Sequence, residues 1–208
     1  MKKFLFAKKK FKAAILSKLN HPLEIKYIEL PDELKFGQVL VKILYTSICG
    51  SQVGEIQGVK GKDHFLPHLL GHEGVGRVVE TGEGITKVKK NDLVILHWKI
   101  GKGLQSQNPE YFDGSKKINS GSVTTFSEYS IVSENRITNI NTTLPKKILP
   151  LLGCCIPTSF GAVEYNANLK FNQKVLIFGV GGIGHNILIA ASSIGCEITI
   201  VDINLKKL

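Results

Sequence analysis

The sequence predicts a mixed α/β chain in which a β-rich front part is followed by the start of a parallel α/β unit. From Phe11 to Val132, short apolar runs alternate with turn residues, as is typical of antiparallel strands. Beyond Pro145 the chain is richer in small and apolar residues, and a strand–helix–strand pattern occupies residues 175–201. The 208 residues are enough for one large domain or two small ones.

The front part divides into strands at its turn signals. These signals are Asn20-His21-Pro22, Phe36-Gly37, Gly82 with Gly84, and Asn91-Asp92. Strands are predicted at residues 12–16, 23–30, 39–45, 75–80, 93–96 and 126–132, the last of them half-buried. An all-β region built in this way indicates a small barrel. A basic segment at residues 1–10 precedes it and is expected to be frayed.

A glycine-rich turn lies at the centre of the strand–helix–strand pattern. The first strand is predicted at 175–178, the helix at 183–194 and the second strand at 198–201. The residues expected to bind a cofactor are Gly179, Gly181, Gly182, Ile183, Gly184 and Asp202, which ends the second strand. This combination is a dinucleotide-binding fingerprint, since a helix N-terminus attracts phosphates and a carboxylate accepts hydrogen bonds from ribose hydroxyls.

Individual positions of the turn have distinct expected roles. Gly179 permits the tight turn, Gly181 lets backbone N–H groups approach a pyrophosphate, and Gly184 lets the helix pack close to the strand. Asp202 would repel a 2′-phosphate and no Arg follows it, so the sequence favours NAD over NADP. The alternative is a glycine-rich strand–helix turn that binds no nucleotide.

The composition excludes several functional classes. The net charge of +10 comes mostly from scattered Lys residues without a nucleic-acid-recognition motif, which favours a solvated surface that attracts anionic cofactors. No apolar run is as long as a membrane span, and the apolar core near the N-terminus is too short for a signal peptide. The 4 Cys residues lack paired spacing, which favours a reducing cytoplasm or metal ligation over disulfides.

Three dispersed residues, Cys49, His72 and Cys154, are candidate metal ligands. Taken singly, each has an ordinary explanation, because a lone Cys is usually a small buried hydrophobe. Their sequence surroundings are more specific. From about Phe11 onward the chain resembles the zinc-dependent medium-chain dehydrogenase/reductase family, which includes the alcohol dehydrogenases. The resemblance is carried by Cys-Gly-Ser at 49–51, Gly-His-Glu at 71–73, Asn-Asp-Leu-Val at 91–94, Leu-Gly-Cys at 152–154, the glycine turn and Val-Asp-Ile-Asn at 201–204.

The resemblance implies a GroES-like β-barrel catalytic domain at residues 11–150. It implies that residues 151–208 are the first βαβ unit of an incomplete Rossmann domain that binds NAD. A cytoplasmic enzyme is expected, with a small alcohol, aldehyde or ketone as substrate and no nucleic-acid or membrane partner. We also expect it to form a homo-oligomer or to associate with a missing C-terminal half.

The same resemblance assigns the chemistry. It implies one catalytic Zn²⁺ on Cys49, His72 and Cys154, the Cys₂His set known in alcohol dehydrogenase, with a fourth position open to an alcohol oxygen. Ser51 would accept the alcohol proton, and hydride would pass from the carbinol carbon of a primary or secondary alcohol or a polyol to NAD. Glu73, next to a ligand, would modulate the metal as a neighbouring carboxylate.

Three local features depart from the family pattern. Gln52 stands where many relatives carry an Asp that orients the ligating His, so the zinc would be more electrophilic. No Cys lies between Cys49 and Cys154, so the polar stretch at residues 98–123 cannot hold the structural zinc of many relatives. We expect this stretch to be a connection without secondary structure, and one of this length is usually functional or disordered. It would shape a substrate mouth or a subunit contact. Gly50 brings the chain closer to the polyol and threonine dehydrogenase branches.

The fourth departure is length. A doubly wound dinucleotide-binding domain has about six strands, and Leu208 comes soon after the second predicted one. The sequence therefore predicts a truncated product, a gene fragment or half of a split enzyme, incomplete or inactive alone, with an exposed apolar sheet face. The alternatives are a non-catalytic zinc-binding remnant, a zinc-free quinone-reductase-type member, disfavoured because that branch lacks the ligands, and a basic nucleic-acid-binding protein.

Overall fold

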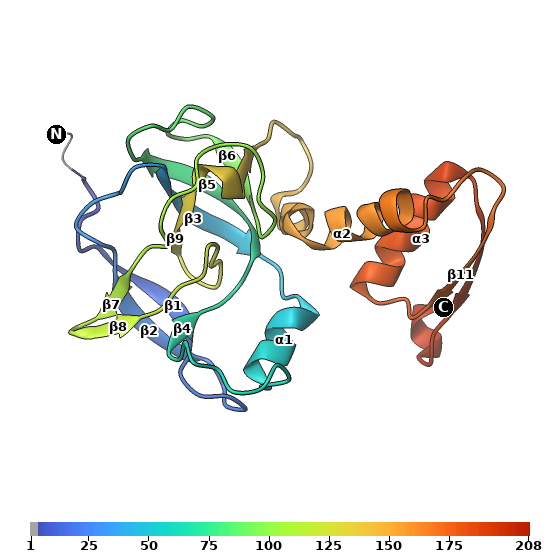
Figure 1. Ribbon diagram of the computed structural model, residues 1–208, viewed down its shortest axis with the longest axis horizontal. Coiled ribbons are helices and arrows are strands. Elements are labelled where there is room, and N and C mark those ends of the chain that lie inside the picture. Colours follow the sequence, from blue (N-terminus) through green and yellow to red (C-terminus); the bar gives the residue numbers. More distant parts are fainter. Residues whose placement is uncertain (1–3) are drawn as a thin grey trace. The chain divides into compact units, whose positions relative to one another are not determined.

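The computed structural model describes residues 4–208. The chain divides into two compact units between Gly153 and Cys154 (Figure 1). This division lies a few residues beyond the boundary expected from the sequence.

The first unit contains two five-stranded sheets (Figure 1). One sheet has the order β4-β1-β2-β7-β8, with β1 Lys10–Leu16, β2 Glu24–Glu29, β4 His68–Leu69, β7 Tyr111–Asp113 and β8 Lys116–Ile118. The other has the order β10-β6-β5-β3-β9, with β3 Gln38–Thr46, β5 Glu73–Thr81, β6 Leu93–His97, β9 Tyr129–Ser133 and β10 Ile137–Asn139. Within both sheets the paired strands are antiparallel.

The segment just before β9 connects the two sheets. Ala14 N–H donates to the carbonyl of Phe126 at 2.8 Å, and Glu128 N–H donates to the carbonyl of Lys12 at 3.0 Å. Because β9 itself pairs with β3 of the other sheet, these bonds bring the sheets into one nearly closed barrel. The small barrel predicted from the sequence is therefore confirmed.

The barrel core follows from the alternation of apolar residues along β1. Phe11, Ala13 and Ile15 point inward and are at most 2% exposed. The ring of Phe11 meets the rings of Tyr111 and Tyr129 edge to face, with centroids 5.7 and 5.9 Å apart. β9 is buried along its whole length, so the prediction of a half-buried strand there is wrong.

The polar stretch at residues 98–123 is ordered against the barrel. It contains the β7–β8 hairpin, and the phenol of Tyr111 is fully buried, where it accepts a hydrogen bond from Ile131 N–H at 2.9 Å. Earlier in the stretch, Ser106 N–H donates to the hydroxyl of Ser133 at 3.0 Å. The expectation of a connection without secondary structure is wrong, since this segment contributes two strands to a sheet.

The N-terminal segment also differs from its prediction. Residues 1–3 lie outside the described part of the chain. Phe4 is 8% exposed within the core, Phe6 packs against the same cluster, and Lys9 Nζ donates to the hydroxyl of Tyr129 at 2.8 Å. From Phe4 onward the segment is therefore packed rather than frayed, because its aromatic residues complete one end of the core.

Short helices complete the first unit. They are α1 Gly50–Ile56 and the 3₁₀ segments η1 Glu134–Arg136 and η2 Lys146–Gly153. In residues 4–208 no single helix is both long and apolar enough to cross a membrane, and only η2 taken with the following helical segment, as a bent pair, meets the length and composition of a span.

The second unit begins with α2 Cys155–Gly161, which continues into a π-helical turn, η3 Ala162–Asn166. Then come β11 Lys174–Phe178, α3 Gly182–Ile194, β12 Glu197–Val201 and the short η4 Leu205–Lys207. β11 and β12 pair in parallel, with Lys174 opposite Glu197, and Gly195 ends α3 in the left-handed conformation. The predicted strand–helix–strand order is confirmed.

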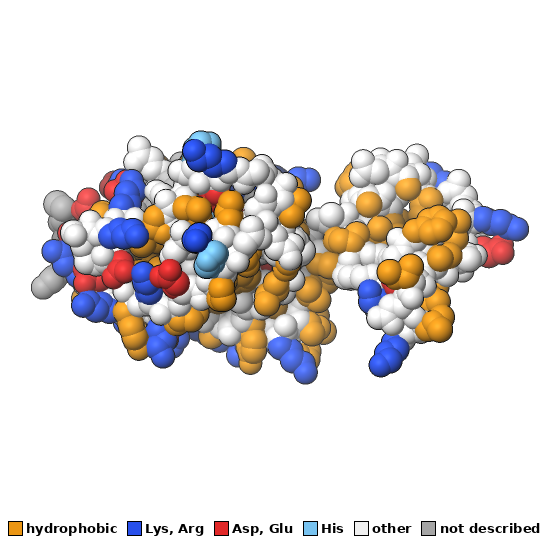
Figure 2. Space-filling model, turned by 90° about the horizontal axis from the view of Figure 1, so that it is seen from below, with side chains coloured by type: hydrophobic (Ala, Val, Ile, Leu, Met, Phe, Trp, Pro, Cys, Tyr) orange, Lys and Arg blue, Asp and Glu red, His pale blue; other side chains and the backbone are white. Residues whose placement is uncertain are grey.

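Apolar side chains remain exposed on this two-stranded sheet, as expected. Leu176 and Phe178 on β11 are 55% and 75% exposed, and Val201 on β12 is 41% exposed. Hydrophobic side chains are prominent on the smaller unit in Figure 2. On the face drawn there, Lys and Arg side chains are dispersed, with Asp and Glu side chains among them. This dispersed charge agrees with a solvated surface.

Candidate functional site

Cys49 lies where β3 gives way to α1. It is the N-cap residue of this helix, with an extended backbone at φ −88° and ψ 148°, and it is half-buried. Ser51 and Gln52 follow in the first turn of α1. Gln52 turns into the protein and is 4% exposed, whereas Ser51 faces solvent.

His72 lies between β4 and β5, at a position that the preceding glycine fixes. Gly71 has a φ of +91°, and a Cβ there would meet the hydroxyl of Thr125 and come within 2.9 Å of Phe126 N. The backbone is held there because Thr125 and Phe126 both donate from N–H to the carbonyl of Leu70, at 3.0 Å. The Gly-His-Glu pattern therefore places the imidazole beside α1.

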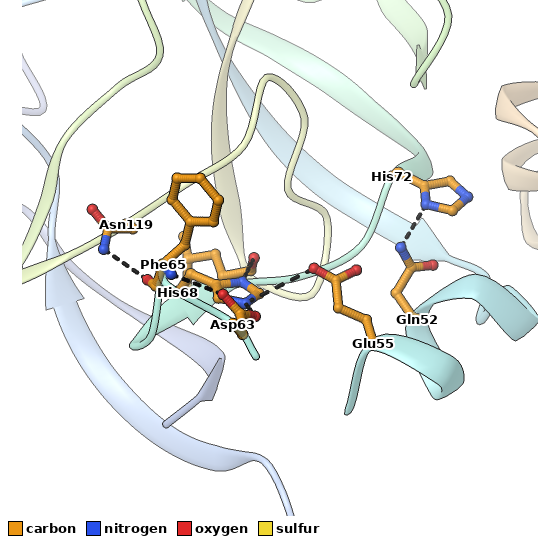
Figure 3. A network of polar contacts seen from close by, with 8 residues as sticks. Gln52, Glu55, Asp63, Phe65, His68, His72 and Asn119 are labelled. Atoms are coloured by element: carbon orange, nitrogen blue, oxygen red, sulfur yellow. Dashed lines mark hydrogen bonds and ion pairs between the residues drawn. The ribbon is translucent and has the colours of Figure 1, made fainter. Parts of the chain in front are cut away.

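The amide of Gln52 contacts the imidazole of His72 (Figure 3). The distance from Gln52 Nε2 to His72 Nδ1 is 2.5 Å. Two buried atoms of the pair, His72 Nε2 and Gln52 Oε1, have no hydrogen-bond partner among the described residues. Burial lowers the pKa of His72, with Glu73 and Glu55 opposing this shift, so the ring is neutral at pH 7.

Turning the amide by half a rotation improves this pair. The oxygen and nitrogen of an amide are assigned from their hydrogen-bond network. When Oε1 of Gln52 points toward His72, this oxygen accepts a hydrogen bond from Nδ1–H of the imidazole. Nε2 of His72 then carries the lone pair of the neutral ring. A buried imidazole nitrogen with a lone pair and no partner is suited to a metal ion.

Cys154 completes the group. It follows Gly153, which is packed so tightly on the barrel that a Cβ there would meet the carbonyl of Leu96 and lie 2.9 Å from Cβ of Glu73. Because Cys154 is bonded directly to Gly153, its backbone begins next to β5. One donor atom each from Cys49, His72 and Cys154 lies within 4.8 Å of the others. The structure thus brings together all three candidate ligands.

Glu73 is the first residue of β5 and is 2% exposed. Its backbone carbonyl accepts a hydrogen bond from the hydroxyl of Thr46 at 2.9 Å. Glu73 directly follows the candidate ligand His72. Its Cβ also faces Gly153, the residue that precedes the candidate ligand Cys154.

A cavity of about 440 Å³ in the first unit includes His72 and Gln52 in its wall. The polar residues Glu55, Asp63 and His68 also line it, and no sequence motif marks them. Glu55 lies one turn after Gln52 on α1, a spacing that places both on one face once the helix is known.

The glycine turn lies in the second unit. Gly179 has a φ of +87°, as the tight turn requires, and a Cβ on Gly184 would meet the carbonyl oxygen of Gly179. The predicted reason for Gly184, close approach of helix and strand, is therefore confirmed. A Cβ on Gly181 would meet nothing within 4 Å, so the space beside this residue is open.

Asp202 closes this turn through its own hydrogen bonds. Its Oδ2 accepts from Val180 N–H at 2.7 Å and its Oδ1 accepts from Asn204 N–H at 2.8 Å. The N–H groups of Asn204 and Val180 lower the pKa of Asp202. Lys207 Nζ lies 3.7 Å from the carboxylate, a positive charge that the sequence-based argument against NADP did not include.

Comparison with known proteins decides the family. Residues 35–142 match the family model described as the alcohol dehydrogenase GroES-like domain. The chain belongs to this family. The chain is 32% identical over 224 residues to an S-(hydroxymethyl)glutathione dehydrogenase of Escherichia coli, which covers 95% of the chain and 60% of the relative. It is 30% identical over 223 residues to the class-3 alcohol dehydrogenase of Cereibacter sphaeroides, with 94% and 59% covered.

Solved structures show the same fold for this member of the alcohol dehydrogenase family. An alcohol dehydrogenase zinc-binding domain protein from Burkholderia ambifaria superposes with a TM-score of 0.85 at 21% identity, over 96% of the chain and 60% of that protein. Benzyl alcohol dehydrogenase from Acinetobacter calcoaceticus superposes with a TM-score of 0.83 at 24% identity and the same coverage. The chain spans about 60% of the length of the curated relatives it matches.

Proposed function

We propose that this chain supplies the zinc site and the first part of the nucleotide site of an NAD-dependent alcohol dehydrogenase. The reaction is hydride transfer between a primary or secondary alcohol, including a polyol, and NAD. The observation that carries the proposal is the approach of the donor atoms of Cys49, His72 and Cys154 to within 4.8 Å of one another.

The donor set suits zinc. Two thiolates and one imidazole leave one position of a tetrahedral ion open, which is the arrangement of a catalytic rather than a structural site. The buried Nε2 of His72, which has no hydrogen-bond partner within residues 4–208, is the atom that such an ion needs. Zinc held by these residues supplies a Lewis acid for an alcohol oxygen.

Neighbouring residues prepare this site for proton transfer. Gln52 fixes the orientation of the His72 ring through its contact with Nδ1. Ser51 is two residues beyond Cys49 and exposed, so its hydroxyl is open to a substrate and to water and can take the proton of an alcohol. Glu73 places a buried carboxylate beside His72 and adjusts the charge of the site.

The glycine turn supports the nucleotide part of the proposal. The open space at Gly181 admits a pyrophosphate next to backbone N–H groups at the start of α3. Gly182 and Ile183 continue this surface into the first turn of the helix. Asp202, held at the end of β12, offers its remaining lone pairs to the ribose hydroxyls of NAD.

Metal content of the purified chain tests the proposal. After loading with zinc and exhaustive dialysis, we expect a single zinc ion per chain, and we expect it to be lost in the Cys49→Ala and Cys154→Ala variants. Cys196→Ala is the matched control, because Cys196 lies outside the proposed ligand set and its thiol contacts the carbonyl of Lys170. Full zinc retention in Cys49→Ala would reject the proposed ligand set.

A further inference from the structure

The cavity beside His72 has a polar far wall. Figure 3 shows Glu55 between the Gln52–His72 pair and a second pair, Asp63 with His68. The loop residues Asn108, Asn119 and Ser122 line the same cavity. Both members of the second pair and Glu55 come from the first unit, so the whole wall lies within one compact unit.

His68 is held at both of its ring nitrogens by oxygen acceptors. Nδ1 lies 2.9 Å from the carbonyl of Leu69, and Nε2 lies 2.9 Å from Oδ2 of Asp63 and 3.8 Å from Oε1 of Glu55. Each ring nitrogen therefore has an oxygen atom within hydrogen-bond distance, and these contacts fix the orientation of the ring between the Asp63 side chain and the backbone.

The two carboxylates differ in what remains open to a ligand. Both oxygens of Asp63 already have a partner within the protein, because Oδ1 accepts from Phe65 N–H at 2.8 Å and Oδ2 lies 2.9 Å from Nε2 of His68. Burial raises the pKa of Asp63, but the Phe65 N–H and His68 outweigh it, so Asp63 is ionised at pH 7. The 3.8 Å contact of Glu55 is longer than a hydrogen bond, so its oxygens remain able to accept.

An apolar surface completes the cavity. The side chain of Phe65 is 72% exposed and lies beside the polar wall. A carboxyl group next to an aromatic ring suits a ligand that presents hydrogen-bond donors on one side and C–H groups on the other. An apolar alcohol in the same place would offer no hydrogen-bond donor to the side chain of Glu55, which is 30% exposed.

We propose that Glu55, which lies 3.8 Å from His68 of the Asp63–His68 pair, is a substrate-recognition site for a polyhydroxylated alcohol. Its carboxylate accepts hydrogen bonds from hydroxyl or ammonium groups on the part of the substrate away from the reacting carbinol. This inference rests on the proposed function, because it takes the neighbouring His72 to mark the reacting end. It names a substrate class distinct from aromatic alcohols.

Binding to the zinc-loaded chain, followed by ligand-detected saturation-transfer NMR, tests this proposal without a turnover assay. The probes are sorbitol, glucosamine and benzyl alcohol. We expect both polar probes to bind at least about tenfold more tightly than benzyl alcohol, as one charge-assisted hydrogen bond provides. A larger loss of glucosamine than of sorbitol in Glu55→Gln would assign an ammonium donor, and equal losses would assign hydroxyl donors.

The variants make the outcome specific. Glu55→Gln should weaken the polar probes about tenfold, and Asn108→Ala, on an exposed loop, should weaken them without affecting folding. Glu110→Gln is the matched control, because Glu110 pairs with Lys117 at the surface, outside this cavity. Benzyl alcohol binding as tightly as sorbitol, no binding of either polar probe, or unchanged affinity in Glu55→Gln would overturn the proposal.

Zinc content measured on the same samples separates the two proposals. A chain that holds zinc but binds no polar probe refutes the recognition site and leaves the proposed function intact. A chain that binds sorbitol through Glu55 but holds no zinc refutes the proposed function.

Discussion

The amide of Gln52 lies 2.5 Å from Nδ1 of His72 and is the direct neighbour that orients this ring. The amide oxygen in this place accepts the hydrogen bond from Nδ1–H without adding charge to the site. The pair comes from two separate elements, the start of α1 and the loop before β5, so it also joins these elements.

Replacing Gln52 should weaken zinc binding. Gln52→Leu removes the hydrogen bond to Nδ1, and loss of a partner behind a ligating His typically costs about 10- to 100-fold in metal affinity. Gln52→Glu keeps an acceptor and should retain affinity. Competition with a chromophoric chelator measures the effect, and Gln57→Leu, at the exposed C-cap of α1, serves as control. Equal zinc affinity in Gln52→Leu and wild type would contradict the assigned role.

Gly184→Ala should destabilise the second unit. Its Cβ would collide with the carbonyl of Gly179 and lie 3.0 Å from that carbonyl carbon, so the helix must move from the strand. Overpacking of this kind costs about 1–3 kcal/mol. Gly182→Ala is the matched control in the same helical turn, because its Cβ would meet only Cys155 Sγ at an ordinary 3.6 Å. Urea unfolding followed by circular dichroism compares the two, and equal midpoints would refute the packing argument.

Glu134 should stabilise the barrel through three backbone N–H groups. Oε1 accepts from Thr86 and Lys87 at 2.7 and 2.8 Å, and Oε2 accepts from Leu104 at 2.9 Å. Glu134→Gln turns an amide NH₂ toward at least one of these donors. We expect a loss of about 1.5–3 kcal/mol in the free energy of unfolding at pH 7, against little change for the surface variant Glu110→Gln.

The same residue predicts a pH dependence. Burial raises the pKa of Glu134, but the N–H groups of Leu104, Lys87 and Thr86 outweigh it and hold the pKa below its usual value. A depressed folded-state pKa gives stability that is present above the unfolded pKa of about 4.3 and is lost as pH falls through the folded-state value. The stability difference between wild type and Glu134→Gln should therefore shrink below about pH 4. A stability difference between wild type and Glu134→Gln that grows as the pH falls would contradict this prediction.

Tyr111→Phe should destabilise the barrel although it removes only one oxygen. The phenol is fully buried and is the acceptor for Ile131 N–H, which would be left unsatisfied in the core. Burial also raises the pKa of Tyr111, so the group remains a neutral phenol at any pH used. The expected loss is about 1–3 kcal/mol by chemical denaturation. Tyr27→Phe, at a 59% exposed position, should be nearly neutral, and similar losses in the two variants would contradict this account.

The sequence predicted the barrel and the parallel strand–helix–strand unit because apolar periodicity and turn residues are local signals. It missed α1 because Gly50 and Gly54 give this seven-residue helix a weak propensity, and tertiary packing of Gln52 forms it instead. It missed the β7–β8 hairpin because only two buried residues, Tyr111 and Ile118, anchor these two short strands, and they lie in a largely polar segment. Long-range burial of this kind leaves no periodic pattern.

The candidate ligands were named from sequence by resemblance, since Cys49, His72 and Cys154 are far apart along the chain. Only the fold explains their approach, through the tight packing of Gly71 and Gly153. The wall formed by Glu55, Asp63 and His68 was not foreseen. Its members come from α1, a loop and β4, and no spacing rule connects them.

The central claim is that two sulfurs and one imidazole of this chain share a zinc ion. X-ray absorption at the zinc edge of the loaded chain counts these ligands directly. We predict two sulfur ligands and one imidazole, with one sulfur lost in any zinc that a Cys154→Ala variant still holds. A zinc environment without sulfur, or one with two sulfurs that persists unchanged in Cys154→Ala, would contradict the account.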